Sequence, residues 1–393
     1  MLPISGKLSQ HFGRRRVFMG SVVAFTLASL ACALAENIAL LIALRALQAI
    51  GGAGFTPSAT GIIVDHFGDQ RDRAVSLFGS IFPIGAMLGP VFGGLLVTYW
   101  HWRGVFLIPL PIGIMVLTLA WRFIPPDPPD RRSSFRMDMP GVLLMGAGIF
   151  AGMLAASWLS DSGLSVAFLL SGATATLALW LFLRHIARTD QPFIAPQMLH
   201  GRDFGTVNLV NVIYGGMVFG AMSLVPLYAA NRYGLSALDA GTLLIAQGLA
   251  TVIFSISAAF ALRHTGHRLP IRVGGAVMVA GLVALALSPR LGLTPYAWLA
   301  CSAFLVGSGV GIINPACRNA GLQLAPSQVS TLAAIRSMFM QIGSIISVSI
   351  STAILGASGQ PGLAHAAILL ALAAVLVAAL PVINRVPEHH GAW

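Results

Sequence analysis

The sequence has few charged residues and few cysteines for its length. Only 9% of its 393 residues are charged, against about 25% in ordinary soluble domains, and no stretch between the apolar runs is long enough for a separate soluble domain. The three cysteines, Cys32, Cys301 and Cys317, lie in apolar or span-edge positions. They form neither a secreted disulfide framework nor a pair with metal-ligand spacing, so we interpret them as small hydrophobic residues.

Acidic residues are scarcer still, with 12 Asp and Glu against 23 Lys and Arg. Every acid falls in a loop or near the end of an apolar run, so none is expected in the core of a membrane span. The histidines are placed similarly, and no Ser-His-Asp arrangement or metal cluster is present. These shortages argue against a lipid-modifying enzyme, and we expect no metal and no cofactor. Nucleic acid is not an expected partner, because the longest basic run, Arg14–Arg16, has no interleaved aromatics.

Long apolar runs are what the sequence has in abundance. A helix needs about 20 apolar residues to cross a bilayer core of roughly 30 Å, and such runs recur from end to end. The sequence therefore predicts an all-α, polytopic membrane protein whose first partner is the lipid bilayer. Twelve complete spans are expected, at residues 17–35, 38–64, 74–98, 104–121, 140–159, 163–183, 204–230, 237–262, 271–288, 295–317, 331–357 and 362–384.

The cations are distributed unequally between the two sides that these spans define. One side holds most of the 23 Lys and Arg, whereas the other holds only Arg103, Arg232 and Arg290. Arg45 and Arg336 lie inside spans. Cytoplasmic loops carry the excess of Lys and Arg in membrane proteins, so the sequence predicts a multi-pass inner (plasma) membrane protein with a cytoplasmic C-terminus.

The segment GKLSQHFGRRR at residues 6–16 carries the first of several motifs. It resembles the signature that follows the second helix in the major facilitator superfamily, with matches at Gly6, Gly13, Arg14 and Arg15. The resemblance implies a cytoplasmic gate motif. Gln10 replaces the usual Asp, so the customary ion pair is not expected through that position.

A second motif lies in the span at residues 38–64. Arg45, Gln48 and Gly51 resemble the fourth-helix motif R-x-x-Q-G-x-G of the same family, with Ala49 in place of its first glycine. A guanidinium inside a span normally faces a polar interior, and Gln48 shares its helix face. The resemblance implies a part in proton coupling; the alternative is a role in tying helices together.

The third motif is GAMLGPVFGG at residues 85–94. It fits the antiporter motif G-x-x-x-G-P-x-x-G-G at every position and is typical of exporters. Glycines at this spacing permit close helix contact, and a proline removes a backbone donor and bends a helix. The alternative is ordinary packing of small residues. The residues concerned are Gly85, Gly89, Pro90, Gly93 and Gly94.

The motifs also set the register of the chain within the family. A segment from Trp102 to Gly113 resembles a block of the fourteen-span drug:proton antiporters, with Pro109 replacing an Asn. The resemblance implies a two-bundle fold in which the first helix and most of the second are missing here. Residues 1–10 would then be the last turns of a truncated helix; a short interfacial segment is the alternative. The expected parts are an incomplete N-terminal bundle at 1–124, a two-helix insert with linkers at 125–203 and a six-helix C-terminal bundle at 204–393.

Polar side chains inside the spans of the second bundle are candidates for the wall of a substrate cavity. Burial of a polar group without a partner is costly in a membrane, so these residues either contact substrate or bond to neighbouring helices. They are Asn208, Asn211, Tyr214, Gln247, Asn314 and Arg336.

The predicted function is proton-coupled export of hydrophobic or amphipathic, drug-like molecules by alternating access, with the proton gradient as energy source. The intramembrane arginines and the lack of span acids favour neutral or anionic substrates. A periplasmic adaptor protein is left open as a partner. The alternatives are an uptake carrier of the same fold and a non-transporting remnant or membrane scaffold.

Overall fold

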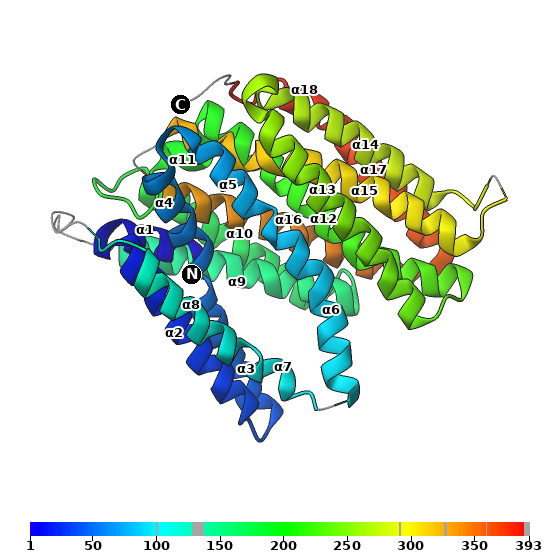
Figure 1. The fold of residues 1–393 in the computed structure, drawn as a ribbon, viewed down its shortest axis with the longest axis horizontal. Coiled ribbons are helices and arrows are strands. Elements are labelled where there is room, and N and C mark those ends of the chain that lie inside the picture. The colour runs from blue at the N-terminus through cyan, green and yellow to red at the C-terminus, as the bar shows by residue number, and fades with distance from the viewer. Residues whose placement is uncertain (100, 128–136, 291, 326–327, 359, 389–393) are drawn as a thin grey trace. The chain divides into compact units, whose positions relative to one another are not determined.

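The protein is a bundle of helices in the computed structural model, which describes residues 1–99, 101–127, 137–290, 292–325, 328–358 and 360–388 (Figure 1). No strand occurs within those ranges. The helices are α1 Leu2–Phe12, α2 Arg14–Ala33, α3 Ile38–Gly52, α4 Phe55–Phe67, α5 Arg71–Gly79, α6 Ile81–Tyr99, α7 Gly104–Leu107, α8 Pro109–Phe123, α9 Met139–Ser162, α10 Val166–Ile186, α11 Pro196–His200, α12 Arg202–Tyr233, α13 Ala237–Thr265, α14 Arg268–Ala286, α15 Pro295–Asn319, α16 Val329–Ala357, α17 Pro361–Ala378 and α18 Leu380–Ile383.

Ten helical stretches among the described residues are long and apolar enough to cross a membrane, which confirms the all-α, multi-pass membrane character. They coincide with ten of the expected spans. The other two expected spans, 74–98 and 204–230, fall on α5 with α6 and on α12, which are helical but are not among the ten. The count of twelve spans stays a prediction.

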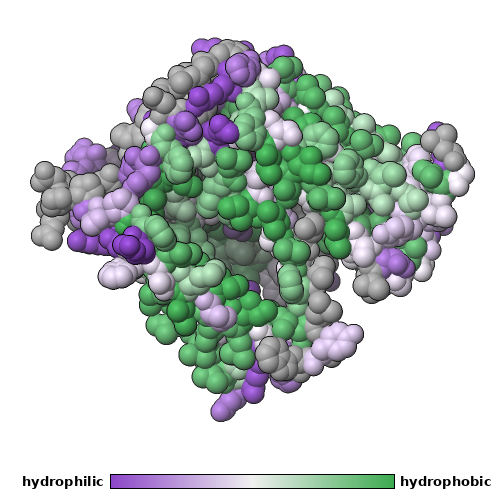
Figure 2. Space-filling model, in the orientation of Figure 1, coloured by the Kyte–Doolittle hydropathy of each residue, from purple (hydrophilic) through white to green (hydrophobic). Residues whose placement is uncertain are grey.

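Polar residues at the turns explain where several spans begin. The side chain of Asn37 accepts a hydrogen bond from the backbone N of Leu40, and Ser165 accepts one from Phe168 at 3.2 Å. Thr294 caps α15 in the same way. Each cap satisfies a backbone donor that the first helical turn leaves open. On the face drawn in Figure 2, hydrophobic residues cover the sides of the helices and hydrophilic residues gather near helix ends, as at the turn between α2 and α3.

Asp138 connects the start of α9 to α10 and to the linker that follows. Its carboxylate accepts bonds from the backbone N of Gly141 at 3.0 Å and of Phe193 at 3.1 Å, and it lies 2.7 Å from Nε2 of His185. Burial alone would raise the pKa of this carboxyl. The bonds from Gly141, His185 and Phe193 outweigh that effect and hold the pKa of Asp138 below its ordinary value. The predicted two-helix insert therefore has a polar anchor at its base.

The chain divides into two compact units by the clustering of its contacts. Unit 1 comprises residues 1–74, 88–136 and 325–335; unit 2 comprises 75–87, 137–324 and 336–393. Each unit thus includes a short segment from the other half of the sequence. The boundaries at 124 and 203 remain predictions, because the clustering of contacts does not test them.

The cores of the two units are built differently. In unit 1, a Cβ on Gly51 would lie 2.6 Å from the backbone N of Phe25, so glycine lets α3 approach the α2 backbone closely. In unit 2, large side chains from five helices are fully buried and pack together as one hydrophobic cluster; they include Tyr228, Leu243, Met278, Leu299 and Leu369.

Candidate functional site

The predicted gate motif spans the end of α1 and the start of α2 in unit 1. Gly13 separates these helices with φ of 100°, a conformation that L-residues with side chains rarely adopt. A Cβ there would also collide with the carboxylate of Asp127. That carboxylate accepts bonds from the backbone N of Arg15 and Arg16, each at 3.1 Å. Asp127 thus caps α2 from a distant part of the sequence, with a negative charge at the positive end of the helix dipole.

Arg14 is buried and has a carboxylate partner that the sequence did not indicate. Its Nη1 lies 2.6 Å from Oδ1 of Asp65 in α4, and it also donates to the carbonyl O of Gly61. Arg14 therefore forms an ion pair with a carboxylate on another helix, although position 10 of the motif carries Gln in place of Asp. Gly6 packs at the same end of unit 1, where a Cβ would lie 2.9 Å from the carbonyl O of Ser330 in α16.

Arg45 lies at one end of a chain of hydrogen bonds in unit 1. Its guanidinium donates to Oε1 of Gln48 and sits 5.6 Å from the centroid of the Phe106 ring. Gln48 donates onward to Oγ of Ser29 at 2.8 Å, and Ser29 donates to the carbonyl O of Phe106 at 3.0 Å. Gln48 and Ser29 are buried, whereas Arg45 is exposed. The charge is thus exposed beside buried polar partners, and the part of Arg45 in proton coupling stays a prediction.

The antiporter motif lies within α6, but two of its glycines do not make the expected helix contact. A Cβ on Gly85 or Gly89 would meet no atom of the described residues within 4 Å. The surroundings of Pro90, Gly93 and Gly94 lie outside the described side chains. At the two described positions, the small-residue face is open in this structure.

Polar residues of α12 and α13 turn mainly to backbone carbonyls. Nδ2 of Asn208 donates to Met198 O, and Nδ2 of Asn211 donates to Val207 O, each at 2.8 Å. The hydroxyl of Tyr214 donates to Val310 O at 3.3 Å. Oδ1 of Asn211 and Oε1 of Gln247 are buried without a hydrogen-bond partner. Asn208 and Tyr214 therefore bond to neighbouring helices, whereas Asn211 bonds within α12, and substrate contact stays a prediction.

Asn314 and Arg318 contact residues 75–87, the segment from the N-terminal half of the sequence that belongs to unit 2. Nδ2 of Asn314 donates to Gly79 O at 3.3 Å, and its Oδ1 accepts from Nε of Arg318 at 3.2 Å. The Arg318 guanidinium lies 4.9 Å and 5.9 Å from the ring centroids of Phe82 and Phe78. A Cβ on Gly79 would collide with it. The Arg318 guanidinium therefore packs against Gly79 of α5 and contacts the Asn314 amide and two phenylalanine rings.

Serine and asparagine hydroxyl and amide groups extend this attachment along the segment. Nδ2 of Asn319 donates to Oγ of Ser76 at 2.8 Å, and the hydroxyls of Ser80 and Ser255 lie 2.9 Å apart. Residues 75–87 are thus also joined to α13 and α15 through small polar side chains.

Arg336 occupies a separate buried position in α16. Its Nε donates to the carbonyl O of Cys317 at 3.3 Å, while its Nη2 is buried without a hydrogen-bond partner. The described residues provide no carboxylate partner for Arg336 or Arg318. Unit 2 therefore contains two buried guanidinium groups without a carboxylate partner in the described part of the chain, and a buried charge is costly.

The sequence missed Asp65 and Arg318 as functional candidates. Both were assigned to loops on the cation-rich side, because the expected spans ended at residues 64 and 317. The helices continue to Phe67 and Asn319, which brings both side chains into helical packing. One local signal was present for Arg318, because it lies one helical turn after Asn314 and shares its helix face.

Comparison with known proteins gives the fold its family. Residues 1–138 and 142–348 match the Major Facilitator Superfamily. The chain belongs to the Major Facilitator Superfamily. The human organic anion transporter MFSD10 has a similar structure, with a TM-score of 0.70, 16% identity, and coverage of 97% of this chain and 80% of that one. This likeness supports the fold.

Curated relatives of this superfamily member carry transport or resistance names. The multidrug resistance protein B homolog of Mycobacterium tuberculosis is 30% identical over 90% of this chain and 66% of its own length. The multidrug transporter protein MdtP of Bacillus subtilis is 29% identical over 80% of this chain and 58% of its own. The riboflavin transporter RibZ of Clostridioides difficile is 27% identical over 86% of this chain and 74% of its own. The chain therefore spans less than two thirds of the first two relatives, and it is similar to transporters rather than to enzymes.

Proposed function

We propose that this protein exports hydrophobic or amphipathic small molecules across the inner membrane by alternating access, driven by inward proton flow. In this proposal the cation-rich ends of the spans, and the C-terminus, face the cytoplasm. Resemblance to proteins named for multidrug resistance supports drug-type transport, and the antiporter motif in α6 supports export.

The observation that carries the proposal is that each unit includes a short segment from the other half of the sequence. Residues 75–87 belong to unit 2 and residues 325–335 to unit 1. The first segment is attached by hydroxyl and amide groups such as Ser80–Ser255, and the second by close packing of Ser330 against Gly6. Alternating access requires contacts of this kind to break and re-form, and short polar or glycine contacts do so at lower cost than a large apolar interface.

Arg45 is the residue that we assign to proton coupling. A guanidinium does not release its proton near neutral pH, so Arg45 would act by lowering the pKa of a carboxyl that approaches it. The described residues show no carboxylate paired with it.

Reconstituted transport tests the proposal directly. The purified protein is placed in liposomes with an imposed proton gradient, and fluorescent compounds of three charge classes are followed: cationic ethidium, neutral riboflavin and anionic fluorescein. We expect gradient-driven transport, stronger for the neutral and anionic compounds. Arg45→Ala should abolish the dependence on the gradient while downhill exchange persists, because Arg45 is exposed and its loss leaves the fold intact. Arg290→Ala, a cation in a loop, is the matched control.

The alternatives predict different results in the same liposomes. Net accumulation in the direction opposite to export would indicate an uptake carrier, an alternative to which the similarity with the riboflavin transporter lends weight. A folded protein that moves none of the compounds, even downhill, would indicate the non-transporting scaffold. Unchanged gradient-driven export in Arg45→Ala would leave the transport proposal standing and refute the coupling assignment.

A further inference from the structure

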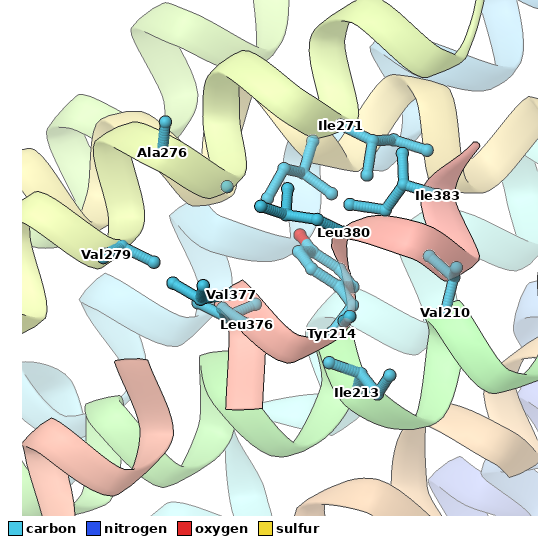
Figure 3. Close-up of a pocket in the computed structure, with 13 residues that line it drawn as sticks. Val210, Ile213, Tyr214, Ile271, Ala276, Val279, Leu376, Val377, Leu380 and Ile383 are labelled. Carbon is cyan, nitrogen blue, oxygen red and sulfur yellow. The ribbon is translucent and has the colours of Figure 1, made fainter. Parts of the chain in front are cut away.

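Unit 2 contains an apolar cavity of about 230 Å³ between α12, α14 and the α17–α18 segment (Figure 3). Its walls include Ile271, Gly275 and Val279 from α14 and Leu376 and Leu380 from the other side. The volume lies below the roughly 300–1,000 Å³ of typical small-molecule sites. The Tyr214 hydroxyl is the polar side-chain group in the wall, and it is already bonded to Val310 O. The cavity therefore suits part of a hydrocarbon chain better than a drug-sized compound.

The cavity is elongated along the spans. Ile271, Gly275 and Val279 are successive turns of α14, and eight residues of helix cover about 12 Å. Leu376, Leu380 and Ile383 follow the same direction on the facing segment, as Figure 3 shows. An extended acyl chain lying parallel to the helices has this shape.

One side of the cavity opens away from the core of unit 2. Val377 and Leu380 are 51% and 41% exposed, whereas Ile271 and Ile383 are buried. The exposed residues belong to apolar spans, so the opening faces lipid. An acyl chain can enter it sideways from the bilayer.

Cationic side chains flank the end of the cavity that lies on the cation-rich side. Arg272 follows Ile271 and donates to Oδ1 of Asn384, next to Ile383, so it bridges the two walls at their ends. Arg385, which follows Asn384 in the sequence, is also exposed. Arg268 is neutralised by Glu388 at 3.4 Å, but the described residues provide no carboxylate for Arg272 or Arg385. A phosphate could bind there.

From this juxtaposition, we infer that the cavity binds one anionic glycerophospholipid, with an acyl chain along α14 and its phosphate at Arg272 and Arg385. Basic sites at the ends of membrane helices attract anionic headgroups, and the apolar cavity adds the chain that a surface charge alone would not hold. Zwitterionic lipid would fill the cavity more weakly, since its headgroup carries no net negative charge.

Native mass spectrometry of the purified protein tests this inference. Phosphatidylglycerol and phosphatidylcholine with identical acyl chains are titrated, and the bound lipids are counted. We expect one phosphatidylglycerol to bind at least tenfold more tightly than phosphatidylcholine, since a basic residue near a membrane surface contributes about fivefold. Replacing both Arg272 and Arg385 with Gln should remove this preference without unfolding the protein, because both side chains are exposed.

A second variant tests the chain-binding part. A Cβ on Gly275 would meet no atom within 4 Å, so Gly275→Leu should fill the cavity and remove the tight adduct. Gly172→Leu is the matched control, because Gly172 on α10 also has open space around it. Equal binding of the two lipids by the unmodified protein, or full phosphatidylglycerol binding by Gly275→Leu, would overturn the inference. The inference would also be overturned if the molecule bound in the cavity were a transported compound rather than phosphatidylglycerol, and if Gly275→Leu alone removed it.

Discussion

Two arginine sites, one in each unit, use the same parts in different ways. Arg45 and Arg318 each bond to the amide oxygen of a neighbour on their own helix, Gln48 and Asn314, and each lies near phenylalanine rings. Arg45 is exposed above buried partners, whereas Arg318 is only 7% exposed. One site presents its charge outward, and the other encloses its charge against α5.

The difference is explained by what each amide bonds to next. Gln48 passes its hydrogen bond to Ser29 on α2, within unit 1, so its network can stay intact when other segments move. Asn314 donates to the carbonyl O of Gly79 and to Oγ of Ser255, so its network includes residues 75–87. The first site is a fixed support for a charge, and the second is an attachment that depends on where α5 lies.

Removing the two amides should produce the largest contrast between the sites. Asn314→Ala leaves the buried Arg318 Nε without its acceptor and Gly79 O without a donor, and a buried hydrogen bond to a charged group contributes about 1.5–3 kcal/mol. Gln48→Ala leaves an exposed arginine that water can solvate, so its cost should be about 1 kcal/mol. Thermal melting in detergent compares the two variants. If Gln48→Ala lowers the melting temperature as much as Asn314→Ala does, the distinction between support and attachment is wrong.

Replacement of the buried charge itself should have the opposite sign for stability. Arg318→Met keeps the length and packing over Gly79 but removes a guanidinium that has no carboxylate partner among the described residues. Replacement of buried ion pairs by apolar residues is often neutral or stabilising by about 1–4 kcal/mol, and a buried charge without such a partner lacks the attraction that offsets its desolvation. We expect an unchanged or higher melting temperature. We also expect at least tenfold slower transport, because residues 75–87 would then contact an apolar side chain in place of a polar group whose contacts can break and re-form.

A control variant separates charge from packing at this position. Arg318→Lys keeps the charge but loses the planar group that stacks on Phe78 and Phe82. It should fall between the native protein and Arg318→Met in transport. A melting temperature that falls in Arg318→Met would show that the guanidinium stabilises unit 2 and would contradict the interpretation of a costly, functional charge.

Much of the fold followed from the sequence, because apolar length and helix breakers are local signals. The Arg45–Gln48 pairing was also predictable, since residues three apart share a helix face. The partners from distant parts of the chain were not. Asp65 for Arg14, and Asp127 as a cap of α2, depend on tertiary packing that no local pattern encodes. The open environment of Gly85 and Gly89 was likewise unpredictable, because a glycine motif specifies what can pack but not whether it is packed in a given structure.

The smallest expected effect concerns the aromatic rings, and it sharpens the comparison at the level of one contact. Phe82→Leu and Phe106→Leu each remove a ring near a guanidinium, at 4.9 Å and 5.6 Å from its centroid. Cation–π contacts contribute about 0.5–1 kcal/mol at exposed sites and about 2 kcal/mol when desolvated. Because Arg318 is buried and Arg45 is exposed, Phe82→Leu should lower the melting temperature more than Phe106→Leu. The difference should vanish when each change is repeated beside Arg318→Met and Arg45→Met, since no cation then remains for the ring to contact. A difference that persists in those double variants would come from packing of the rings, and the enclosed charge would not be its cause.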